Sequence, residues 1–482
     1  MTAAHLQALN LDGEISGKRK LPRYDNLKSC PIQFILRMPS HWRVEKLKHV
    51  ASVRFSSVDK KSEDGEMPVR LCNYTDVYNR DVIFDDPDFM QATATEAEIK
   101  RFTLRKGDVL ITKDSEEWND IAVPAYVAEN LPGVLCGYHL ALIRPNQDEI
   151  DGSFLSRAFS AEGIREQFHI AANGITRFGL PNRAISGALF PIPPLNEQRA
   201  IAAFLKRETG RIDELIQKKQ RLIALAEEAR LSLITSAVTK GIAPGETRKP
   251  SGIEWLKAIP FGWSALPFRR VLSGIEQGWS PQADQRRTEG DEWAVLKVGA
   301  VLKGRFRPEE HKALPPDLEP ERRFEVKEGD LLLTRGNTPE LVADVCVVPV
   351  VRQRLMLSDL HYRLTLDESR LSKRFACYWL LSWAGRQQIE ADAHGTSNSM
   401  VKVSQGDIRS WMVLMPPLDV QIQITDYLDH RLRLFDELAF RVTDGIARLR
   451  QYRFLLISTA VTGQIDVRQY RHNPEAMSEV TA

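Results

Sequence analysis

Two short stretches of the sequence have the residue types of a metal-dependent phosphodiesterase. Pro87-Asp88 with Glu98-x-Lys100, and Pro316-Asp317 with Glu325-x-Lys327, resemble the pattern in which two carboxylates hold a divalent cation and a lysine assists the reaction. When the two halves of the chain are aligned, Glu98-x-Lys100 falls opposite Pro320-x-Arg322, so the matches are not one repeated feature. So short a pattern arises readily in a chain with 27% charged residues, and we interpret both matches as coincidence.

The motifs of other catalytic classes are missing. The sequence has no Asn/Asp-Pro-Pro-aromatic motif with a glycine-rich cofactor loop, as a methyltransferase requires, and no phosphate-binding loop of an ATPase. Metalloprotease and hydrolase motifs are also absent. His139 and His361 occupy equivalent positions beside apolar strands. A general-base role stays open for these two histidines, but a structural or hydrogen-bonding role is the favoured interpretation.

Basic, amide, hydroxyl and aromatic side chains on loops at strand ends are candidates for nucleic-acid contact. Phosphates attract cations, and base edges pair with arginine, lysine, asparagine or glutamine side chains. A solvated loop side chain explains any single candidate equally well, so the prediction rests on their clustering. The candidates are Asn73, Tyr74, Tyr78, Lys113, Thr176 and Arg177 in the first half of the chain, and Lys297, Arg335, Asn337, Ser397, Asn398 and Lys402 in the second half.

These two sets belong to two copies of one unit, because the sequence repeats internally. The run Pro193–Gln198 returns as Pro416–Gln421, an offset of 223 residues, and Ala237-Val238-Thr239 returns at the same offset as Ala460-Val461-Thr462. Weaker landmarks upstream are Pro39-x-x-Trp42 with Pro260-x-x-Trp263 at an offset of 221, and Gly107 with Gly329 and His139 with His361 at an offset of 222. A register kept this closely indicates a duplication.

The C-terminal part of each copy is predicted to form a long helix. In steps of three and four residues from Leu205 and from Leu428, seven of ten positions are apolar in both copies. A 3.5-residue period over more than four heptads favours a coiled-coil seam, and the alternative is two amphipathic helices that each pack on their own domain. The seam residues predicted to serve spacing or partner binding are Leu205, Ile212, Leu215, Leu222, Leu233, Leu428, Phe435, Leu438, Leu449 and Leu456.

The predicted fold class is α+β. Short apolar runs bounded by Gly, Pro and Asp, such as Val109-Leu110-Ile111 and Leu331-Leu332-Leu333, indicate two mixed but strand-rich globular domains. An antiparallel coiled coil of the two long helices, each about 65 Å long, would separate these domains and relate them by a pseudo-twofold axis. The two chain termini would then lie close together.

The landmarks divide the chain into seven segments. Both helical regions begin at a proline pair, and a stretch rich in Gly, Pro and Lys follows the first of them. The predicted segments are residues 1–37 (N-terminal segment), 38–193 (first globular domain), 194–241 (first helical region), 242–259 (linker), 260–415 (second globular domain), 416–463 (second helical region) and 464–482 (C-terminal tail).

Length and composition agree with this organisation. The 482 residues suffice for several domains, and 43% hydrophobic residues are ordinary for a globular protein. A net charge of +2, from 66 Lys and Arg against 64 Asp and Glu, does not by itself indicate a nucleic-acid binder. Five scattered cysteines predict a reducing compartment without a zinc site. Since no membrane-spanning stretch or signal peptide is recognisable, we expect a cytoplasmic protein.

The duplicated helix start, the Ala-Val-Thr helix end and Lys249–Trp255 leading to Trp263 together resemble the specificity subunit of type I restriction-modification systems, over about residues 24 to 466. The resemblance implies that each globular unit is a target recognition domain, which reads one half of a split, asymmetric site in double-stranded DNA. It implies that the helices space these domains and bind two modification (methyltransferase) subunits. It also implies no catalysis and no metal in this chain. S-adenosylmethionine, ATP and Mg are expected in partner subunits, and restriction (translocase/nuclease) subunits would join through the complex.

The second copy departs mildly from this family pattern. Asp419-Val420 stands where the first copy has Asn196-Glu197, Thr462-Gly463 where it has Thr239-Lys240, and Gly445 lies on the predicted seam. These changes would weaken the second partner-binding surface. Two rival hypotheses are a nuclease or methyltransferase that acts alone, and a structural coiled-coil adaptor without sequence preference.

Overall fold

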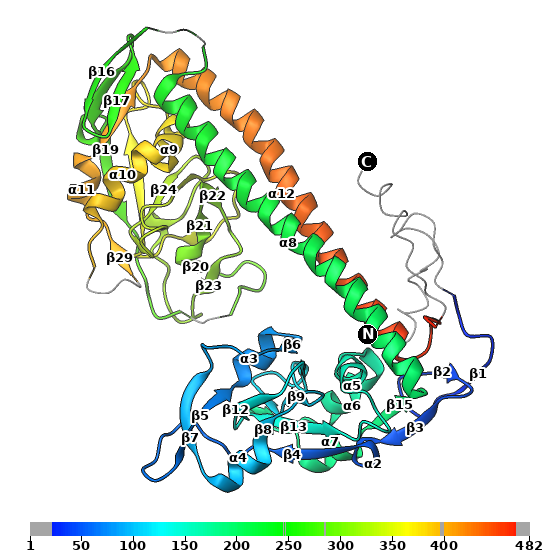
Figure 1. Ribbon diagram of the computed structural model, residues 1–482. Coiled ribbons are helices and arrows are strands. Elements are labelled where there is room, and N and C mark those ends of the chain that lie inside the picture. Colours follow the sequence, from blue (N-terminus) through cyan, green and yellow to red (C-terminus); the bar gives the residue numbers. More distant parts are fainter. Residues whose placement is uncertain (1–21, 244, 246, 284–285, 396–399, 469–482) are drawn as a thin grey trace. The chain divides into compact units, whose positions relative to one another are not determined.

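The computed structural model describes residues 22–243, 245, 247–283, 286–395 and 400–468, which form two compact units (Figure 1). Of the described residues, those within 22–218 and 444–468 belong to unit 1, and those within 219–443 belong to unit 2. Each unit contains one strand-rich region and one half of each of two long helices. None of the helices in the described ranges combines the length and the apolar character that crossing a membrane requires.

Two sheets form the strand-rich region of unit 1. The larger sheet, of order β4-β13-β9-β11-β6, is antiparallel except that β6 runs parallel to β11. Buried side chains from both sheets share one core, in which Leu110 and Leu142 join Leu71 and Leu135. The strands are β4 (Ala51–Phe55), β13 (Leu140–Pro145), β9 (Val109–Thr112), β11 (Pro124–Val127) and β6 (Val82–Ile83), and in the second sheet β7 (Met90–Ala94), β5 (Met67–Cys72), β12 (Leu131–Cys136) and β8 (Thr103–Leu104).

Short helices and two-stranded sheets complete this region. The helices are α2 (Leu47–Val50), α3 (Tyr74–Asn79), α4 (Glu96–Phe102), α5 (Gly152–Phe159), α6 (Glu162–Ala171) and α7 (Asn182–Gly187). The paired strands are β1 (Leu27–Ser29) with β2 (Arg37–Pro39), β3 (Arg43–Lys46) with β15 (Leu189–Ile192), and β10 (Asp114–Ser115) with β14 (Phe178–Gly179). Glu98, a residue of one phosphodiesterase-like match, caps α4 by accepting the backbone N–H of Thr95 at 3.2 Å. Its carboxylate therefore has a structural role.

Unit 2 repeats this plan. Its main sheet joins β19 (Leu272–Gln277), β28 (His361–Leu366), β24 (Leu331–Thr334) and β26 (Val345–Val347), and a second sheet joins β23 (His311–Ala313), β20 (Ala294–Leu296) and β27 (Leu355–Met356). The two-stranded sheets pair β16 (Arg248–Ile253) with β17 (Leu256–Pro260), β18 (Ser264–Pro267) with β30 (Met412–Met415), β21 (Val301–Leu302) with β22 (Arg305–Phe306), and β25 (Gly336–Asn337) with β29 (Val401–Lys402). The helices are α9 (Lys373–Leu381), α10 (Trp383–Asp392) and α11 (Gln405–Ser410), with 3₁₀ turns η1 (Phe268–Arg270), η2 (Val298–Ala300) and η3 (Arg322–Phe324).

The repeat extends to individual turns. The strands β4-β13-β9-β11 and β19-β28-β24-β26 have the same order and the same antiparallel pairing. In the Gly-Asp turn before the central strand, Asp108 Oδ2 accepts the N–H of Arg105 at 2.8 Å, and Asp330 Oδ2 accepts the N–H of Lys327 at 2.9 Å. Gly107 has a φ of +97°, a conformation that favours glycine. The repeated Gly-Asp motif therefore builds a turn.

The segment expected as a linker, residues 242–259, contains structure of its own. Strands β16 and β17 form a hairpin that corresponds to the hairpin of β1 and β2 in the N-terminal segment. Gly252 turns with a φ of +76°, and the side chains of Ile253 and Ile259 join the core of unit 2. A composition rich in Gly and Pro is typical of loops, but here Pro250 and Gly252 lie within β16, at a register shift in its pairing with β17.

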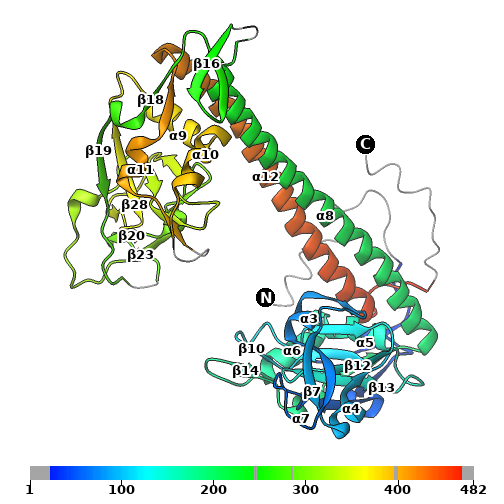
Figure 2. The ribbon, with the colours of Figure 1, turned by 60° about the vertical axis from the view of Figure 1, so that its left-hand side comes forward.

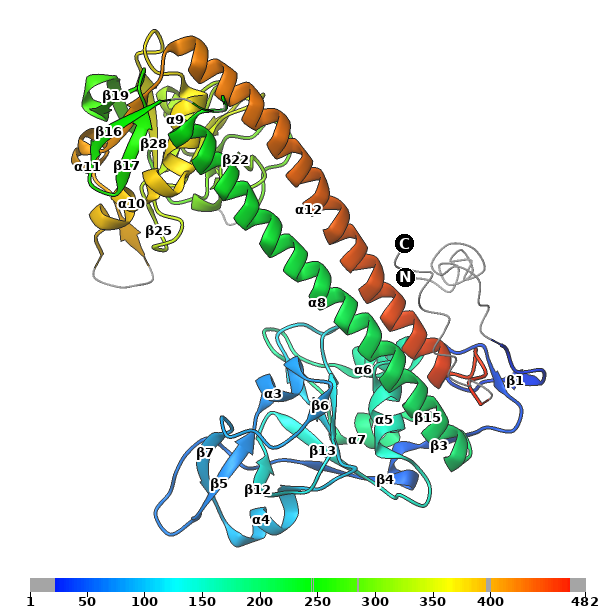
Figure 3. The same ribbon diagram turned by 45° about the horizontal axis from the view of Figure 1, so that its top comes forward.

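Two long helices, α8 (Leu195–Lys240) and α12 (Leu418–Val461), lie side by side in Figure 1, Figure 2 and Figure 3. In unit 1, the start of α8 and the end of α12 both reach Trp42, through Glu197 and Gly463. In unit 2, the end of α8 and the start of α12 share a core with Trp263, through Val238 and Ile424. The two helices are therefore antiparallel within each unit, and the predicted pair of packed helices is confirmed.

A glutamine fixes the start of each long helix. Gln198 is fully buried, its Oε1 accepts the N–H of Asp151 at 2.7 Å, and its Nε2 donates to Glu149 O and Pro193 O at 3.1 and 2.8 Å. Its repeat counterpart Gln421 makes the matching three bonds, to Ser372 N, Arg370 O and Pro416 O. The glutamine of the repeated proline-pair motif thus ties each long helix to the loop before α5 or α9.

The predicted seam is correct at alternate positions only. From Leu205 the buried stripe steps first by four and then by three, through Thr209, Ile212 and Ile216, and α12 follows the same order from Leu428 through Leu432. The predicted seam instead steps by three residues first and then by four. Every second predicted position therefore falls one residue outside the stripe, and Leu215, Leu222 and Leu438 are 46%, 43% and 38% exposed.

The described ends of the chain meet in unit 1. Asp466 N donates to Pro22 O at 2.7 Å, and Gln464 Nε2 donates to Arg37 O at 2.7 Å. A Cβ on Gly463 would lie 2.2 Å from Pro39 Cδ, so only glycine allows this close approach. The predicted proximity of the two ends holds for these residues, and the termini themselves lie outside the described residues.

Candidate nucleic-acid interface

Loops at one end of β9 gather most of the predicted contact residues of unit 1. Lys113 follows β9 directly, and the pairing of β10 with β14 places Asp114 opposite Gly179. Leu180 N donates to Lys113 O at 2.8 Å, so the loop 173–177, which carries Thr176 and Arg177, ends beside Lys113. Helix α3, with Tyr74 and Tyr78, packs against β9. Residues distant in sequence thus come together on one loop cluster.

Asp114 organises this cluster. Arg177 Nη2 donates to Asp114 Oδ1 at 2.6 Å, and His139 Nδ1 lies 2.9 Å from Asp114 Oδ2. The side chain of Arg177 is nevertheless 55% exposed. A Cβ on Gly174 would lie 1.9 Å from Arg177 O, so the loop can take this course only with glycine at that position. The guanidinium is therefore held in place while much of it faces solvent, which suits contact with a phosphate or a guanine edge.

The Lys113 ammonium is fixed above an aromatic ring. Its Nζ lies 4.3 Å from the ring centroid of Tyr138 and donates to Ser56 O at 3.3 Å. Burial lowers the pKa of Lys113, and the neighbouring Asp114 opposes this shift. The cation–π contact and the carbonyl restrict the side chain to one direction.

Tyr74 and Tyr78 form a stacked pair on α3. Their ring centroids are 5.5 Å apart with an interplanar angle of 14°. Tyr78 OH donates to Asp120 Oδ2 at 2.6 Å, and this bond is the main reason that the pKa of Tyr78 is raised to about 12. Asn73 differs from its neighbours, because it is the N-cap residue of α3 and only 9% exposed. It supports the helix and offers little surface to a base.

The corresponding loops of unit 2 have the same plan with different side chains. Arg335 follows β24 as Lys113 follows β9, and Gly336 pairs with Lys402 across β25 and β29. Arg335 and Lys402 line a hollow of about 270 Å³ together with Tyr362, His394, Val403, Ser404 and Asp407. Two cations thus face one surface hollow.

Three other candidates of unit 2 contribute less to this arrangement. Asn337 Oδ1 accepts the N–H of Thr338 at 2.9 Å, so its side chain is engaged locally. Lys297 follows β20 in the other sheet and does not line the hollow. Ser397 and Asn398 lie outside the described residues.

The two repeated histidines have different environments. His361 is fully buried, its Nδ1 lies 2.8 Å from Ser358 Oγ, and burial lowers its pKa to about 4. It is a structural residue, as the sequence favoured. His139 lies next to Asp114 and Arg177 at the edge of the loop cluster instead. Sequence reasoning missed the organising role of Asp114, although the Lys-Asp pair after a buried strand was a usable signal.

The phosphodiesterase-like matches gain no support from the geometry. Glu325 Oε1 accepts the N–H of Arg354 at 2.7 Å, and Glu98 caps α4. Within the described ranges, no three His, Cys, Asp or Glu side chains are grouped in a way that could hold a metal ion.

Comparison with known proteins finds one family of relatives. The family model described as "Type I restriction modification DNA specificity domain" matches residues 39–224. The chain is 22% identical over 449 residues to the putative type I restriction enzyme MjaX specificity subunit of Methanocaldococcus jannaschii, which covers 92% of this chain and 97% of that protein. The chain is thus similar, over most of its length, to specificity subunits of type I restriction-modification systems. Specificity subunits of this family are non-catalytic in type I restriction-modification complexes.

Two further matches show how much of the chain is shared with known proteins. The type I restriction enzyme EcoEI specificity subunit of Escherichia coli is 28% identical over 185 residues, which span 38% of this chain and 31% of that relative. A solved chain, described as "Structural basis underlying complex assembly and conformational transition of the type I R-M system", has a TM-score of 0.62 at 17% identity. That match covers 89% of this chain and 99% of the solved chain, so the fold is shared along most of the chain.

Proposed function

We propose that this protein is a specificity subunit that reads a split, asymmetric site in double-stranded DNA. The strand-rich region of each unit, which we call its recognition region, would bind one half of the site. The observation that carries the proposal is the repeated loop cluster at the end of β9 and of β24. In both places a cation follows the central strand and a second cation lies on the paired loop, as Lys113 with Arg177 and as Arg335 with Lys402. Different side chains on one repeated framework suit two different half-site sequences.

The near-neutral charge of the chain is compatible with this function. A net charge of +2 provides no strong general field for DNA. The cations of the loop clusters supply local contacts, and partner subunits would add others. Affinity for DNA should therefore depend on the complete complex more than on this subunit alone.

The outer faces of the two long helices are proposed to bind two modification subunits. A helix pair buries its inner stripe, but α8 and α12 also expose large apolar side chains, which in a soluble protein mark partner surfaces. The exposed residues are Leu215, Leu222, Leu225 and Leu231 on α8, and Ile422, Leu434, Leu438 and Phe440 on α12. The buried stripe, which includes Leu205, Ile212, Leu428 and Leu456, would hold the helices together and set the gap between half-sites.

The proposed assembly places all catalysis in partner subunits. S-adenosylmethionine would bind to the modification subunits, and ATP and Mg to restriction subunits that join through the complex and cleave unmodified DNA. We place the complex in the cytoplasm, which agrees with five cysteines that are all free thiols.

Methylome mapping tests this proposal. The chain is co-expressed with its modification partner in a host that lacks other adenine methyltransferases, and methylated bases are mapped by single-molecule sequencing. We expect one bipartite motif with two unlike halves and a fixed gap. A contiguous motif would contradict the two-region reading. The purified chain alone should neither methylate DNA with S-adenosylmethionine nor cut it with Mg, and turnover in either assay would favour the enzyme hypothesis. DNA binding without sequence preference would favour the adaptor.

A further inference from the structure

An arginine interrupts the buried stripe of each long helix at the same repeat position. Arg230 of α8 and Arg453 of α12 are separated by the repeat offset of 223 residues, and both are largely buried. A guanidinium in an apolar stripe loses hydration and needs partners to compensate for that loss. Each arginine finds such a partner in the recognition region of its own unit.

In unit 1, Arg453 connects three elements. Its guanidinium pairs with the carboxylate of Asp81, which lies between α3 and β6 of the recognition region. Its Nε lies 2.9 Å from Asp213 Oδ1 on α8. Asp81 Oδ2 also accepts a hydrogen bond of 2.7 Å from Arg157 Nη1 on α5. Burial alone would raise the pKa of Asp81, but Arg157 and Arg453 hold it below its usual value, so the carboxylate stays charged.

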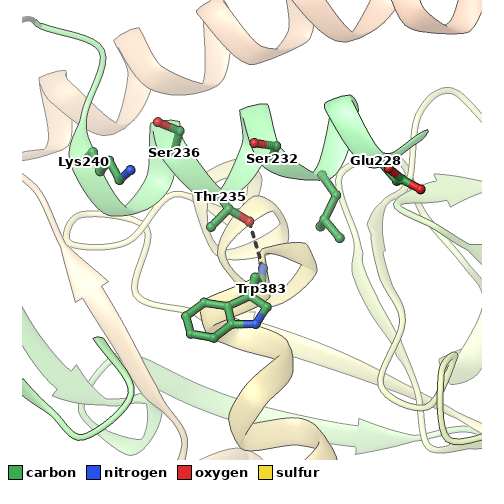
Figure 4. Close-up of a pocket in the computed structure, with 7 residues that line it drawn as sticks. Glu228, Ser232, Thr235, Ser236, Lys240 and Trp383 are labelled. Carbon is green, nitrogen blue, oxygen red and sulfur yellow. Dashed lines mark hydrogen bonds between the residues drawn. The ribbon is translucent and has the colours of Figure 1, made fainter. Parts of the chain in front are cut away.

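A second contact follows five residues later on the same helix. Ser458 Oγ accepts the N–H of Glu162, the first residue of α6, at 3.1 Å. In unit 2, Thr235 Oγ1 accepts the N–H of Trp383, the first residue of α10, at 2.9 Å (Figure 4). Ser458 and Thr235 are again one repeat offset apart. The first N–H groups of a helix lack partners within that helix, so a hydroxyl on the long helix satisfies one of them.

The arginine contact of unit 2 is built differently. Arg230 Nη1 donates to the carbonyl of Lys303 at 3.3 Å, so a backbone oxygen takes the place of a carboxylate. Asp436, the repeat counterpart of Asp213, pairs with Arg305 of the recognition region. The Arg305 and Asp436 side chains are 46% and 44% exposed, and solvent weakens such a pair. In unit 1 the Asp81 side chain is equally exposed, at 46%, but its partners Arg157 and Arg453 are only 14% and 22% exposed. The arginines of the unit 1 network are therefore the more buried ones.

We infer that Arg453 is a positioning residue, which through Asp81 fixes the orientation of the first recognition region on the helices of its unit and thereby limits the gap that the protein accepts between half-sites. This inference rests on the proposed reading of a split site. Two separate contacts, at Arg453 and at Ser458, prevent rotation of the region about either one. One added base pair shifts a half-site by about 3.4 Å and turns it by about 34°. A recognition region whose Asp81 no longer pairs with Arg453 could follow such a change.

Gap tolerance in a methylome tests this inference. The complex with the modification subunit carries Arg453→Ala, or Asp81→Asn, which removes the carboxylate charge with little change of shape. For both variants we expect methylation at gaps one base pair shorter or longer to rise at least tenfold over the wild-type level, with both half-site sequences unchanged. Arg453→Lys should keep most of the wild-type preference, because the ammonium can still pair with Asp81. Arg43→Ala removes an exposed pair with Glu149 in the same unit, away from the outer faces of the long helices, and should change nothing.

The outcomes separate the inference from the proposed function. If both variants methylate only the wild-type gap, at any overall level, Arg453 is merely structural and the inference is overturned. If Arg453→Ala yields no folded complex, the milder Asp81→Asn decides alone. If the wild-type complex itself lacks a bipartite motif, the proposed function fails instead, whatever the variants do.

Discussion

The indole N–H of Trp42 donates a hydrogen bond of 3.0 Å to the carboxylate of Glu197, the glutamate of the repeated motif at the start of α8. The same buried carboxylate accepts the hydroxyl of Tyr24 and lies 2.8 Å from His41 Nε2. The N-terminal hairpin and the first long helix are thus joined through one side chain. In the second copy Val420 stands at this position, so the joint exists in unit 1 alone.

Replacing Glu197 should destabilise unit 1. Glu197→Val copies the residue of the second repeat but leaves the polar groups of Trp42 and Tyr24 buried without their acceptor, at a cost of about 2 to 3 kcal/mol in the free energy of unfolding. Glu197→Gln keeps one acceptor oxygen and should cost less. Chemical denaturation measures both effects. Glu214→Gln, on the exposed face of the same helix, is the control, and equal stability of Glu197→Val and this control would contradict the prediction.

The repeat and the helices could be predicted from the sequence because they rest on patterns that survive without tertiary detail. Proline pairs, a Gly-Asp turn and a 3.5-residue period are local signals. The order of steps along the seam was not predictable in this way, since Leu215 and Ile216 are both apolar and only the partner helix decides which one is buried. The hairpin in residues 242–259 was missed because Gly and Pro are typical of loops, while here Pro250 and Gly252 lie at an irregularity within a strand.

The loop clusters could be predicted only in part. Lys113 and Arg177 were found from residue type, and β10 with β14 brings them together. Asn73 has the right chemistry for a base contact, but it caps α3 and is nearly buried. Whether a polar side chain reads a base or completes a helix depends on its neighbours in space, and the sequence does not contain that information.

Acid should destabilise unit 2 through His361. Burial lowers the pKa of His361 to about 4 in the folded protein, while an unfolded histidine titrates near its ordinary value of 6.5. Between these values the unfolded chain binds the additional proton, so stability is lost as the pH falls from about 6.5 towards 4. The loss through this residue should approach about 3 kcal/mol.

Denaturation at several pH values checks this effect of His361. His361→Asn should flatten the dependence between pH 4 and 6.5, although the variant is less stable at neutral pH. His49→Asn, at an exposed histidine of unit 1, controls for the mere removal of a histidine. The same slope in wild type and in His361→Asn would show that other groups cause the acid sensitivity.

Arg177→Ala should affect one half-site only. Asp114 orients the guanidinium at the tip of a loop in unit 1, so its loss should relax the preference for the bases that it contacts by about 1 to 3 kcal/mol. Lys113→Ala should act on the same half. Methylome mapping of each variant measures the preference at both halves, with Arg43→Ala, an exposed residue paired with Glu149 outside the loop cluster, as the control. Relaxed preference at both halves would contradict the independence of the two regions.

Lengthening both helices should lengthen the gap in the target. The buried stripe of α8 and α12 repeats every seven residues, so one added heptad in each helix preserves the faces that pack together. We place the insertions after Lys218 and after Thr443, where the chain passes from one unit to the other. Seven residues extend a helix by about 10.5 Å, which corresponds to at most about three base pairs. Methylome mapping should therefore give the same two half-sites with a longer gap.

A second insertion distinguishes length from mere disturbance. Five residues added to each helix at the same positions lengthen it by about 7.5 Å. They also rotate the part of the helix that follows by about 140° beyond a full turn, so its apolar side chains no longer continue the buried stripe. This variant should lose specific methylation or stability, whereas the heptad variant should keep both. An unaltered gap in a stable heptad variant would contradict the prediction that the helices set the spacing, because the only change in that protein is the length of its helices.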